Sequence, residues 1–218
     1  PAPKGHELRF WQVDTLPEHN FLATREAAAG PYPHPALGAG SWDLENTALR
    51  ALRGEAVGLV FQDPMTRLNP LMTVGGHLLD TFAAHRPGMG HHERKDRAES
   101  LLEQVGIGAE RFRAYPHEFS GGMRQRLAIA LAIALAPPLV IADEPTTSLD
   151  VAVAGQVMAV LRNLCEELGS ALLLITHDLA TANRWCEDMA VLDGGRLVEQ
   201  SSSDQVLTHP QSEIAKRL

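Results

Sequence analysis

Short apolar runs that end in polar side chains alternate with helix-like segments from about residue 57 onward. Three of these runs, at 57–61, 139–142 and 171–176, have the length and composition of buried strands. Strands that are apolar throughout and are separated by helices are typical of a parallel sheet. The pattern therefore predicts an α/β fold in which helices cover both faces of a mostly parallel sheet.

The segments between these strands have the periodicity of amphipathic helices. We predict helices at 44–52, across 73–113 with a break at 87–90, from 121 to 136, and at 151–168 before a capping Gly169. Gly194 and Gly195 predict a hairpin over 190–199. We expect five parts. They are a Pro/Gly-rich segment at 1–43, a core strand with its loop at 44–72, a helical subdomain at 73–125, a second core part at 126–200 and a polar tail at 201–218.

Composition excludes several classes of protein. With 218 residues, 44% hydrophobic and a net charge of -8, the chain is neither collagen-like nor disordered, and a dedicated nucleic-acid binder would be basic. The longest apolar run, 127–142, is interrupted by two prolines and is too short to span a bilayer, so we expect a soluble protein. Cys165 and Cys186 form no C-x-x-C pair, and we expect reduced thiols.

Two carboxylates follow the apolar run at 139–142. Ligands of a parallel sheet bind beyond the carboxyl ends of its strands, which is where Asp143 and Glu144 lie in the sequence. One carboxylate could hold Mg²⁺ and the other could orient or deprotonate a water, and phosphoryl transfer needs both roles. A solvated strand end is the alternative interpretation of this hexapeptide.

Residues 120–125, SGGMRQ, open a predicted helix. Ser120 is a good N-cap, and Gly121 and Gly122 would let an anion approach bare backbone N–H groups at the positive end of the helix. A glycine turn before a core helix is the alternative. His177 and Gln62 each follow a predicted strand, where a histidine can contact a phosphate oxygen, although single residues of these types are more often structural.

The order of these motifs is more informative than any one of them. FQDP at 61–64, YPHEFSGGMRQ at 115–125, IADEPTTSLD at 141–150 and ITHD at 175–178 follow one another along the chain. Over about residues 44–210 this sequence resembles the ATP-binding cassette (ABC) ATPases. The stretches at 61–75 and 114–119 are similar to the group that powers dipeptide, oligopeptide and nickel uptake, although Phe119 stands where many members have leucine.

The resemblance implies a P-loop NTPase-like (RecA-like) core with an inserted helical subdomain, and a subunit that couples ATP hydrolysis to import. It also implies the cofactors ATP and Mg²⁺. The expected partners are a second ATPase subunit, transmembrane permease subunits and, indirectly, an extracytoplasmic substrate-binding protein, with no nucleic acid. We therefore expect a cytoplasmic protein, peripheral on the inner face of the cell membrane.

The resemblance also implies a role for each matching residue. Asp143 and Gln62 would contact Mg²⁺, Glu144 would be the catalytic base, and His177 would lie near the γ-phosphate. The remaining matching positions would contact a nucleotide that the opposite ATPase subunit holds or would lie at the dimer interface: Ser120, Gly121, Gly122, Gln125 and Asp150.

One motif of the family is missing from the sequence. The chain contains no G-x-x-x-x-G-K-[ST] run, whose backbone N–H groups and lysine hold the phosphates, and none of Lys4, Lys95 and Lys216 has that context. Three hypotheses follow: an importer ATPase whose N-terminus has been lost or replaced, a degenerate subunit that completes a partner's ATP site through its signature, or an unorthodox nucleotide site or other surface within 1–43.

Overall fold

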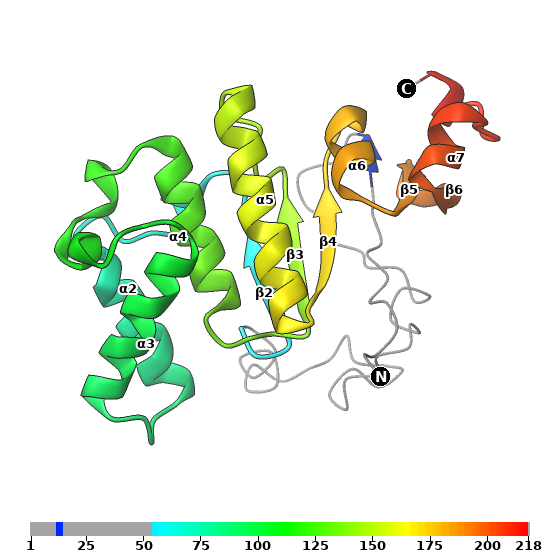
Figure 1. Ribbon diagram of the computed structural model, residues 1–218. Helices are drawn as coiled ribbons and strands as arrows, with labels where there is room; N and C mark the ends of the chain where they lie inside the picture. The colour runs from blue at the N-terminus through cyan, green and yellow to red at the C-terminus, as the bar shows by residue number, and fades with distance from the viewer. Residues whose placement is uncertain (1–11, 15–53, 218) are drawn as a thin grey trace.

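Three parallel strands form the centre of the molecule. The computed structural model describes residues 12–14 and 54–217, within which β2 (Val57–Val60), β3 (Leu139–Asp143) and β4 (Ala171–Ile175) pair in the order β2-β3-β4 (Figure 1). All three strands lie where the apolar runs predicted them. The parallel register aligns their carboxyl ends, so the residues that follow β3 and β4 emerge at the same edge.

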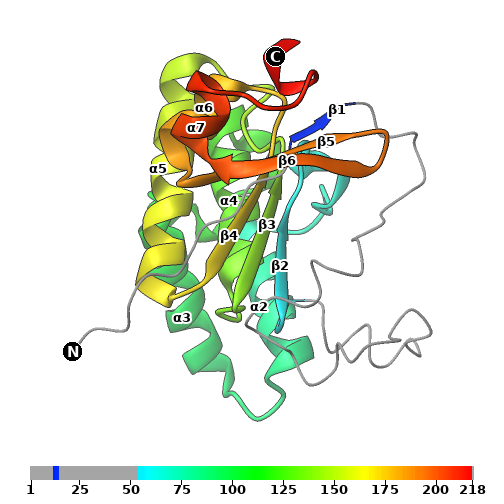
Figure 2. The same ribbon diagram turned by 90° about the vertical axis from the view of Figure 1, so that its right-hand side faces the viewer.

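Helices pack on one face of this sheet in the described part of the chain. Alternate strand residues such as Val140 and Leu174 are fully buried beneath α4 (Gly121–Ile133) and α5 (Val151–Leu168) (Figure 2). Residues of the opposite face are only partly buried, and Leu59 is 39% exposed. The sequence predicted helices on both faces, and the described residues provide them on one.

The helices α4 and α5 have the ends that their capping residues specify. Asp150 accepts a hydrogen bond from the Val153 amide at 3.0 Å and begins α5, and Gly169 ends it with a φ of 67°, as predicted. The α4 helix ends at Ile133, three residues earlier than predicted, because Pro137 and Pro138 follow and a residue before proline avoids the helical region.

A helical arm lies between β2 and α4. It contains α2 (Val74–His85) and α3 (His91–Gln104), joined by a turn at the predicted break, and Phe82 and Leu102 are fully buried in its core. Short 3₁₀ turns flank it: η3 (Pro64–Thr66), η4 (Ala109–Arg113) and η5 (Pro116–Glu118). The predicted helix to 113 stops at Gln104 because Gly106 takes a left-handed φ of 71°.

A second sheet lies beside the first. It has the order β1-β5-β6, in which β5 (Asp188–Asp193) and β6 (Arg196–Ser202) form the predicted hairpin, longer than expected. Gly194 and Gly195 turn the hairpin with φ values of 53° and 76°. The strand β1 (Gln12–Asp14) pairs in parallel with β5 and had no counterpart in the sequence prediction.

The segment expected to be a polar tail contains folded elements. A short helix, α7 (Ser203–Thr208), buries Val206, and η6 (Ala215–Arg217) follows it. The carboxylate of Glu199 accepts the Gln211 and Ser212 amides at 2.9 and 2.7 Å, which ties this segment to β6. The predicted helix at 44–52 and most of segment 1–43 lie outside the described residues.

Two predictions about the whole chain can be compared with the structure. Cys165 and Cys186 are both buried and unpaired, and burial raises the pKa of Cys165 to about 12. Among residues 12–14 and 54–217, no helix is both long and apolar enough to cross a membrane.

Candidate active site

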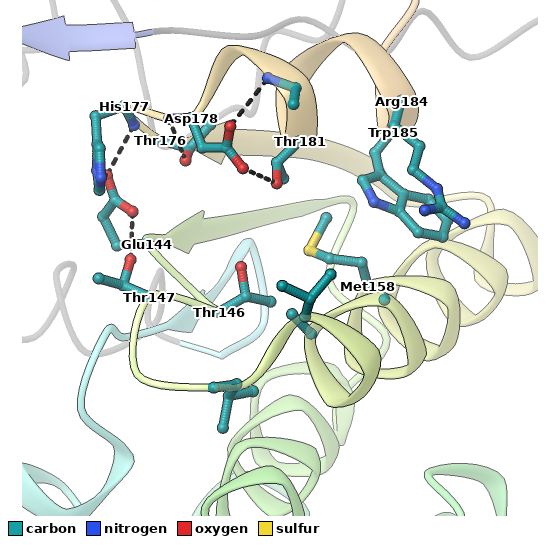
Figure 3. A pocket seen from close by; sticks show the side chains of 15 residues that line it. Glu144, Thr146, Thr147, Met158, Thr176, His177, Asp178, Thr181, Arg184 and Trp185 are labelled. Atoms are coloured by element: carbon teal, nitrogen blue, oxygen red, sulfur yellow. Dashed lines mark hydrogen bonds and ion pairs between the residues drawn. The ribbon is translucent and has the colours of Figure 1, made fainter.

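The carboxyl ends of β3 and β4 bring two of the predicted site residues into contact. Asp143 pairs with Ile175, and the chain stays paired for one more residue because the Glu144 amide donates to the Ile175 carbonyl at 2.9 Å. Glu144 follows β3 and His177 follows β4 by two residues, so both emerge at the same edge of the sheet (Figure 3). The parallel-sheet rule predicted this edge as the site.

Glu144 and His177 form a close pair. The Oε1 atom of Glu144 accepts the His177 backbone N–H at 2.8 Å and lies 2.6 Å from the Nδ1 atom of the same residue (Figure 3). The glutamate side chain is 18% exposed and the histidine side chain is 64% exposed. The pair therefore combines a largely buried carboxylate with an imidazole that solvent or a ligand can reach.

The backbone at Glu144 has an uncommon conformation. Its φ is 45°, in the left-handed region that side chains other than glycine rarely adopt. The Oε2 atom accepts the Thr147 hydroxyl at 2.5 Å, so hydrogen bonds engage both carboxylate oxygens. Strained backbone held by such contacts is common at functional sites.

Asp143 lies at the end of β3 next to Glu144. Burial raises the pKa of the Asp143 carboxyl above its usual range, and the charge of Glu144 raises it further. A bound cation would oppose this effect and lower the pKa of the carboxyl. Within 12–14 and 54–217 no three His, Cys, Asp or Glu side chains gather as a metal site.

Replacing Asp143 with Asn is expected to stabilise the chain at neutral pH. Because the pKa of Asp143 is raised in the folded state, its ionised form is less favourable there than in the unfolded chain. The free energy of unfolding therefore falls as the pH rises from the unfolded-state pKa to the folded-state pKa. The gain is up to about 1 kcal/mol after discounting for solvent screening, or roughly 2–4 °C in Tm. It should disappear below about pH 3, where aspartate is protonated in both states. Equal gains in melting scans at about pH 3 and pH 7 would contradict this cause.

The predicted signature residues lie at the start of α4. Ser120 is exposed and its Oγ accepts the Met123 amide at 3.4 Å, which begins the helix as predicted. A Cβ atom on Gly122 would stand 2.4 Å from Val153 Cγ1, so this glycine allows α4 to approach α5 closely. Gly121 is exposed and lies near Leu149, the residue before Asp150.

Gln125 and Gln62 occupy different environments. Gln125 is 2% exposed and its Nε2 donates to the Phe61 carbonyl at 3.1 Å, so it links α4 to the residue before Gln62. The resemblance places Gln125 among the residues that would contact nucleotide, which stays a prediction. Gln62 follows β2 and is exposed, as is Asp150 at the start of α5.

An open cavity of about 410 Å³ extends from the glutamate–histidine pair toward α6 (Leu179–Trp185). Met158 lines its floor, and Arg184 and Trp185 line its far end (Figure 3). Sequence reasoning missed two polar contributors. Thr147 is one, and Asp178 is the other, with a pKa lowered chiefly by the Thr181 hydroxyl. The position of Asp178 one residue before a helix was the available signal, because aspartate is a favoured N-cap.

Comparisons with known proteins identify the family of the chain. The sequence profile described as ABC transporter matches residues 34–147, more than half of the 218 residues. The chain is 42% identical over 172 residues to the oligopeptide transport ATP-binding protein OppD of Haemophilus influenzae, covering 77% of this chain and 52% of that protein. It is 40% identical to the dipeptide transport ATP-binding protein DppD of Lactococcus lactis, covering 78% of this chain and 49% of that protein.

Solved structures give the same result at the level of the fold. The ATP-binding cassette MJ0796, in a dimeric post-hydrolysis state with ADP and Pi, matches with a TM-score of 0.64 and 31% identity, covering 74% of this chain and 68% of that one. The cbiO1 protein of Clostridium perfringens matches with a TM-score of 0.67 and 28% identity, covering 77% and 64%. The chain spans about half the length of the two curated relatives. From its motifs, its fold and this profile match, the chain belongs to the ABC transporter family.

Proposed function

We propose that this chain is an ATP-binding and ATP-hydrolysing subunit of an importer that takes up peptides. The contact between Glu144 and His177 at the ends of β3 and β4 is the observation on which the proposal chiefly depends. The peptide class rests on the names of the two curated relatives, both of which are peptide transport ATP-binding proteins. Nickel uptake, which the sequence resemblance also includes, has no separate support in the site.

The residues at this edge fit Mg²⁺ and a triphosphate. Mg²⁺ is commonly held by one or two carboxylates together with phosphate oxygens. Asp143 offers a carboxylate whose pKa is raised by burial, and a bound cation would lower that pKa. We assign Asp143 and the exposed amide of Gln62 to this cation. When bound, Mg²⁺ would neutralise charge on the phosphate oxygens.

Glu144 then has the role of general base. Its carboxylate would accept a proton from the water that attacks the γ-phosphate, a role worth roughly 10²–10⁴-fold in rate. His177 holds this carboxylate through its backbone N–H and its imidazole, and we propose that its ring, 64% exposed, lies near a γ-phosphate oxygen. Glu144 would therefore act as the base, His177 would hold it in place, and both would face the γ-phosphate from one edge of the sheet.

The exposed start of α4 supports a second role toward a partner. Ser120 and Gly121 are both exposed at the N-terminus of a 13-residue helix, where backbone N–H groups favour anions. We propose that these residues, with Gly122 behind them and Asp150 beside them, contact nucleotide held by a second ATPase subunit. Gln125 would transmit the position of this helix to Gln62 through its bond to Phe61.

The helical arm is the proposed contact with transmembrane permease subunits. Leu71 lies between Gln62 and the first helix of the arm and is 86% exposed, an apolar side chain suited to a protein contact. Assembly on a permease would place this chain at the inner face of the membrane.

A narrower function is the second candidate. The chain has no G-x-x-x-x-G-K-[ST] run, so the exposed signature could complete a partner's ATP site while the residues around Glu144 remain without a nucleotide of their own. The two candidates differ in which variants stop ATP turnover in a mixed complex.

Calorimetry with Mg-ATP tests whether the chain has a nucleotide site of its own. We expect the Glu144→Gln chain, which cannot turn over, to bind Mg-ATP with a Kd between about 1 µM and 1 mM. Chelating Mg²⁺ should weaken this binding because Asp143 would face the phosphates without a cation. Absence of heat at several millimolar ATP would reject an own-site ATPase and favour the second candidate.

A further inference from the structure

A tight turn follows β3 and brings Thr147 back toward Glu144. The Thr147 amide donates to the Glu144 carbonyl at 3.4 Å, which closes a four-residue turn over 144–147. Pro145 stands second in the turn, where its fixed φ favours this geometry, and it is buried. The local sequence therefore places the Thr147 side chain over the carboxylate three residues earlier.

The Thr147 hydroxyl binds the carboxylate oxygen of Glu144 that does not contact His177. It donates to Oε2 of Glu144 at 2.5 Å, while the backbone N–H and the ring of His177 contact Oε1 (Figure 3). The carboxylate is therefore held at both ends, by β4 on one side and by its own turn on the other. Rotation of the carboxylate plane would break contacts at both oxygens.

The neighbouring threonine provides an internal comparison. Thr146 lines the same cavity, and within residues 54–217 its hydroxyl makes no hydrogen bond to a protein group. Thr147 is the more exposed of the two, so water is available to its hydroxyl, yet the hydroxyl contacts Glu144. The contact is therefore specific to position 147 and does not follow from the composition of the cavity.

We propose that Thr147 is a positioning residue that fixes the carboxylate of Glu144 against His177. Its consequence for catalysis rests on the proposed function, because orientation of a general base matters only where Glu144 serves as one. The positioning itself is a property of the free chain. A charge-assisted hydrogen bond from a short hydroxyl side chain is suited to this role because it limits rotation without adding charge.

Hydrogen exchange at the His177 backbone amide tests the positioning without nucleotide. This amide donates to the oxygen whose orientation Thr147 limits, so Thr147→Val is expected to accelerate its exchange roughly tenfold. Thr147→Ser keeps the hydroxyl and Thr146→Val removes an uninvolved one, and both should stay within about twofold of the parent chain. Amides within β3 and β4 should not change in any variant.

Two exchange results would overturn the proposal. One is unchanged exchange at His177 in Thr147→Val, and the other is equal acceleration throughout β3 and β4, which would indicate general destabilisation. In a complex that hydrolyses ATP, Thr147→Val should lower kcat about tenfold with KM unchanged, and Thr147→Ser should restore it. Absence of turnover in the parent complex would count against the proposed function and would leave the exchange result as the test of Thr147.

Discussion

Glu144→Gln is expected to lower ATP turnover by about 10²–10⁴-fold in a complex that contains this chain. Glutamine has the shape of glutamate and can still accept a hydrogen bond from His177, but it cannot take a proton from water at neutral pH. Nucleotide binding should therefore persist while turnover stops. Phosphate release under saturating Mg-ATP measures the effect.

Ser120→Arg is the matched variant for this experiment. Arginine at the exposed start of α4 would fill the space in which a partner's nucleotide meets the signature, without touching Glu144. If this chain hydrolyses its own ATP, Glu144→Gln stops its share of turnover. If the chain only completes a partner's site, Ser120→Arg stops turnover and Glu144→Gln leaves it within about twofold of the parent complex, which would reject the base role of Glu144 in this complex.

Gly58→Ala is expected to destabilise the chain by about 2–3 kcal/mol, which lowers Tm by roughly 4–12 °C. A Cβ atom at this position would stand 2.3 Å from the Ala132 carbonyl oxygen and 3.1 Å from Pro137 Cγ. The first contact is with backbone, so no side chain can rotate to relieve it, and β2 would have to move away from α4. Because Phe61 and Gln125 join these two elements, the displacement would also reach Gln62.

Gly88→Ala is the control, because it makes the same change in the entropy of the unfolded backbone without a steric clash. No heavy atom lies within 4 Å of a Cβ atom built at this position, so the same chemical change should be neutral or slightly stabilising. Urea denaturation of the three chains measures the difference. Similar free energies of unfolding for Gly58→Ala and the parent chain would show that β2 and α4 do not pack as closely as described.

Much of the core could be predicted because its signals are local. The three parallel strands follow from apolar runs of strand length, and α5 follows from its periodicity between Asp150 and Gly169. The shared edge of Glu144 and His177 follows from the rule that ligands bind beyond the carboxyl ends of parallel strands. These inferences need only neighbouring residues and one general property of sheets.

The features that the sequence did not predict depend on contacts with residues that are far apart in the sequence. A three-residue strand such as β1 has no period to detect, and its pairing with β5 joins residues about 180 positions apart. The segment after β6 is polar in sequence, yet Val206 and the bonds to Glu199 fold it against the body. The hydrogen bond from Gln125 to Phe61 joins residues 64 positions apart, so no local signal in the sequence predicts it.

The sequence by itself determined the chemistry of this protein: which residues can bind a cation, accept a proton or begin a helix, and in what order they occur. Only the tertiary structure decided how those groups meet. It joined one carboxylate oxygen of Glu144 to His177 and the other to Thr147, and it turned Gln125 inward. The physical reason is that helix caps and the periodicity of apolar residues depend on neighbours in sequence. Hydrogen bonds between strands depend on packing that brings residues distant in sequence within about 3 Å of one another.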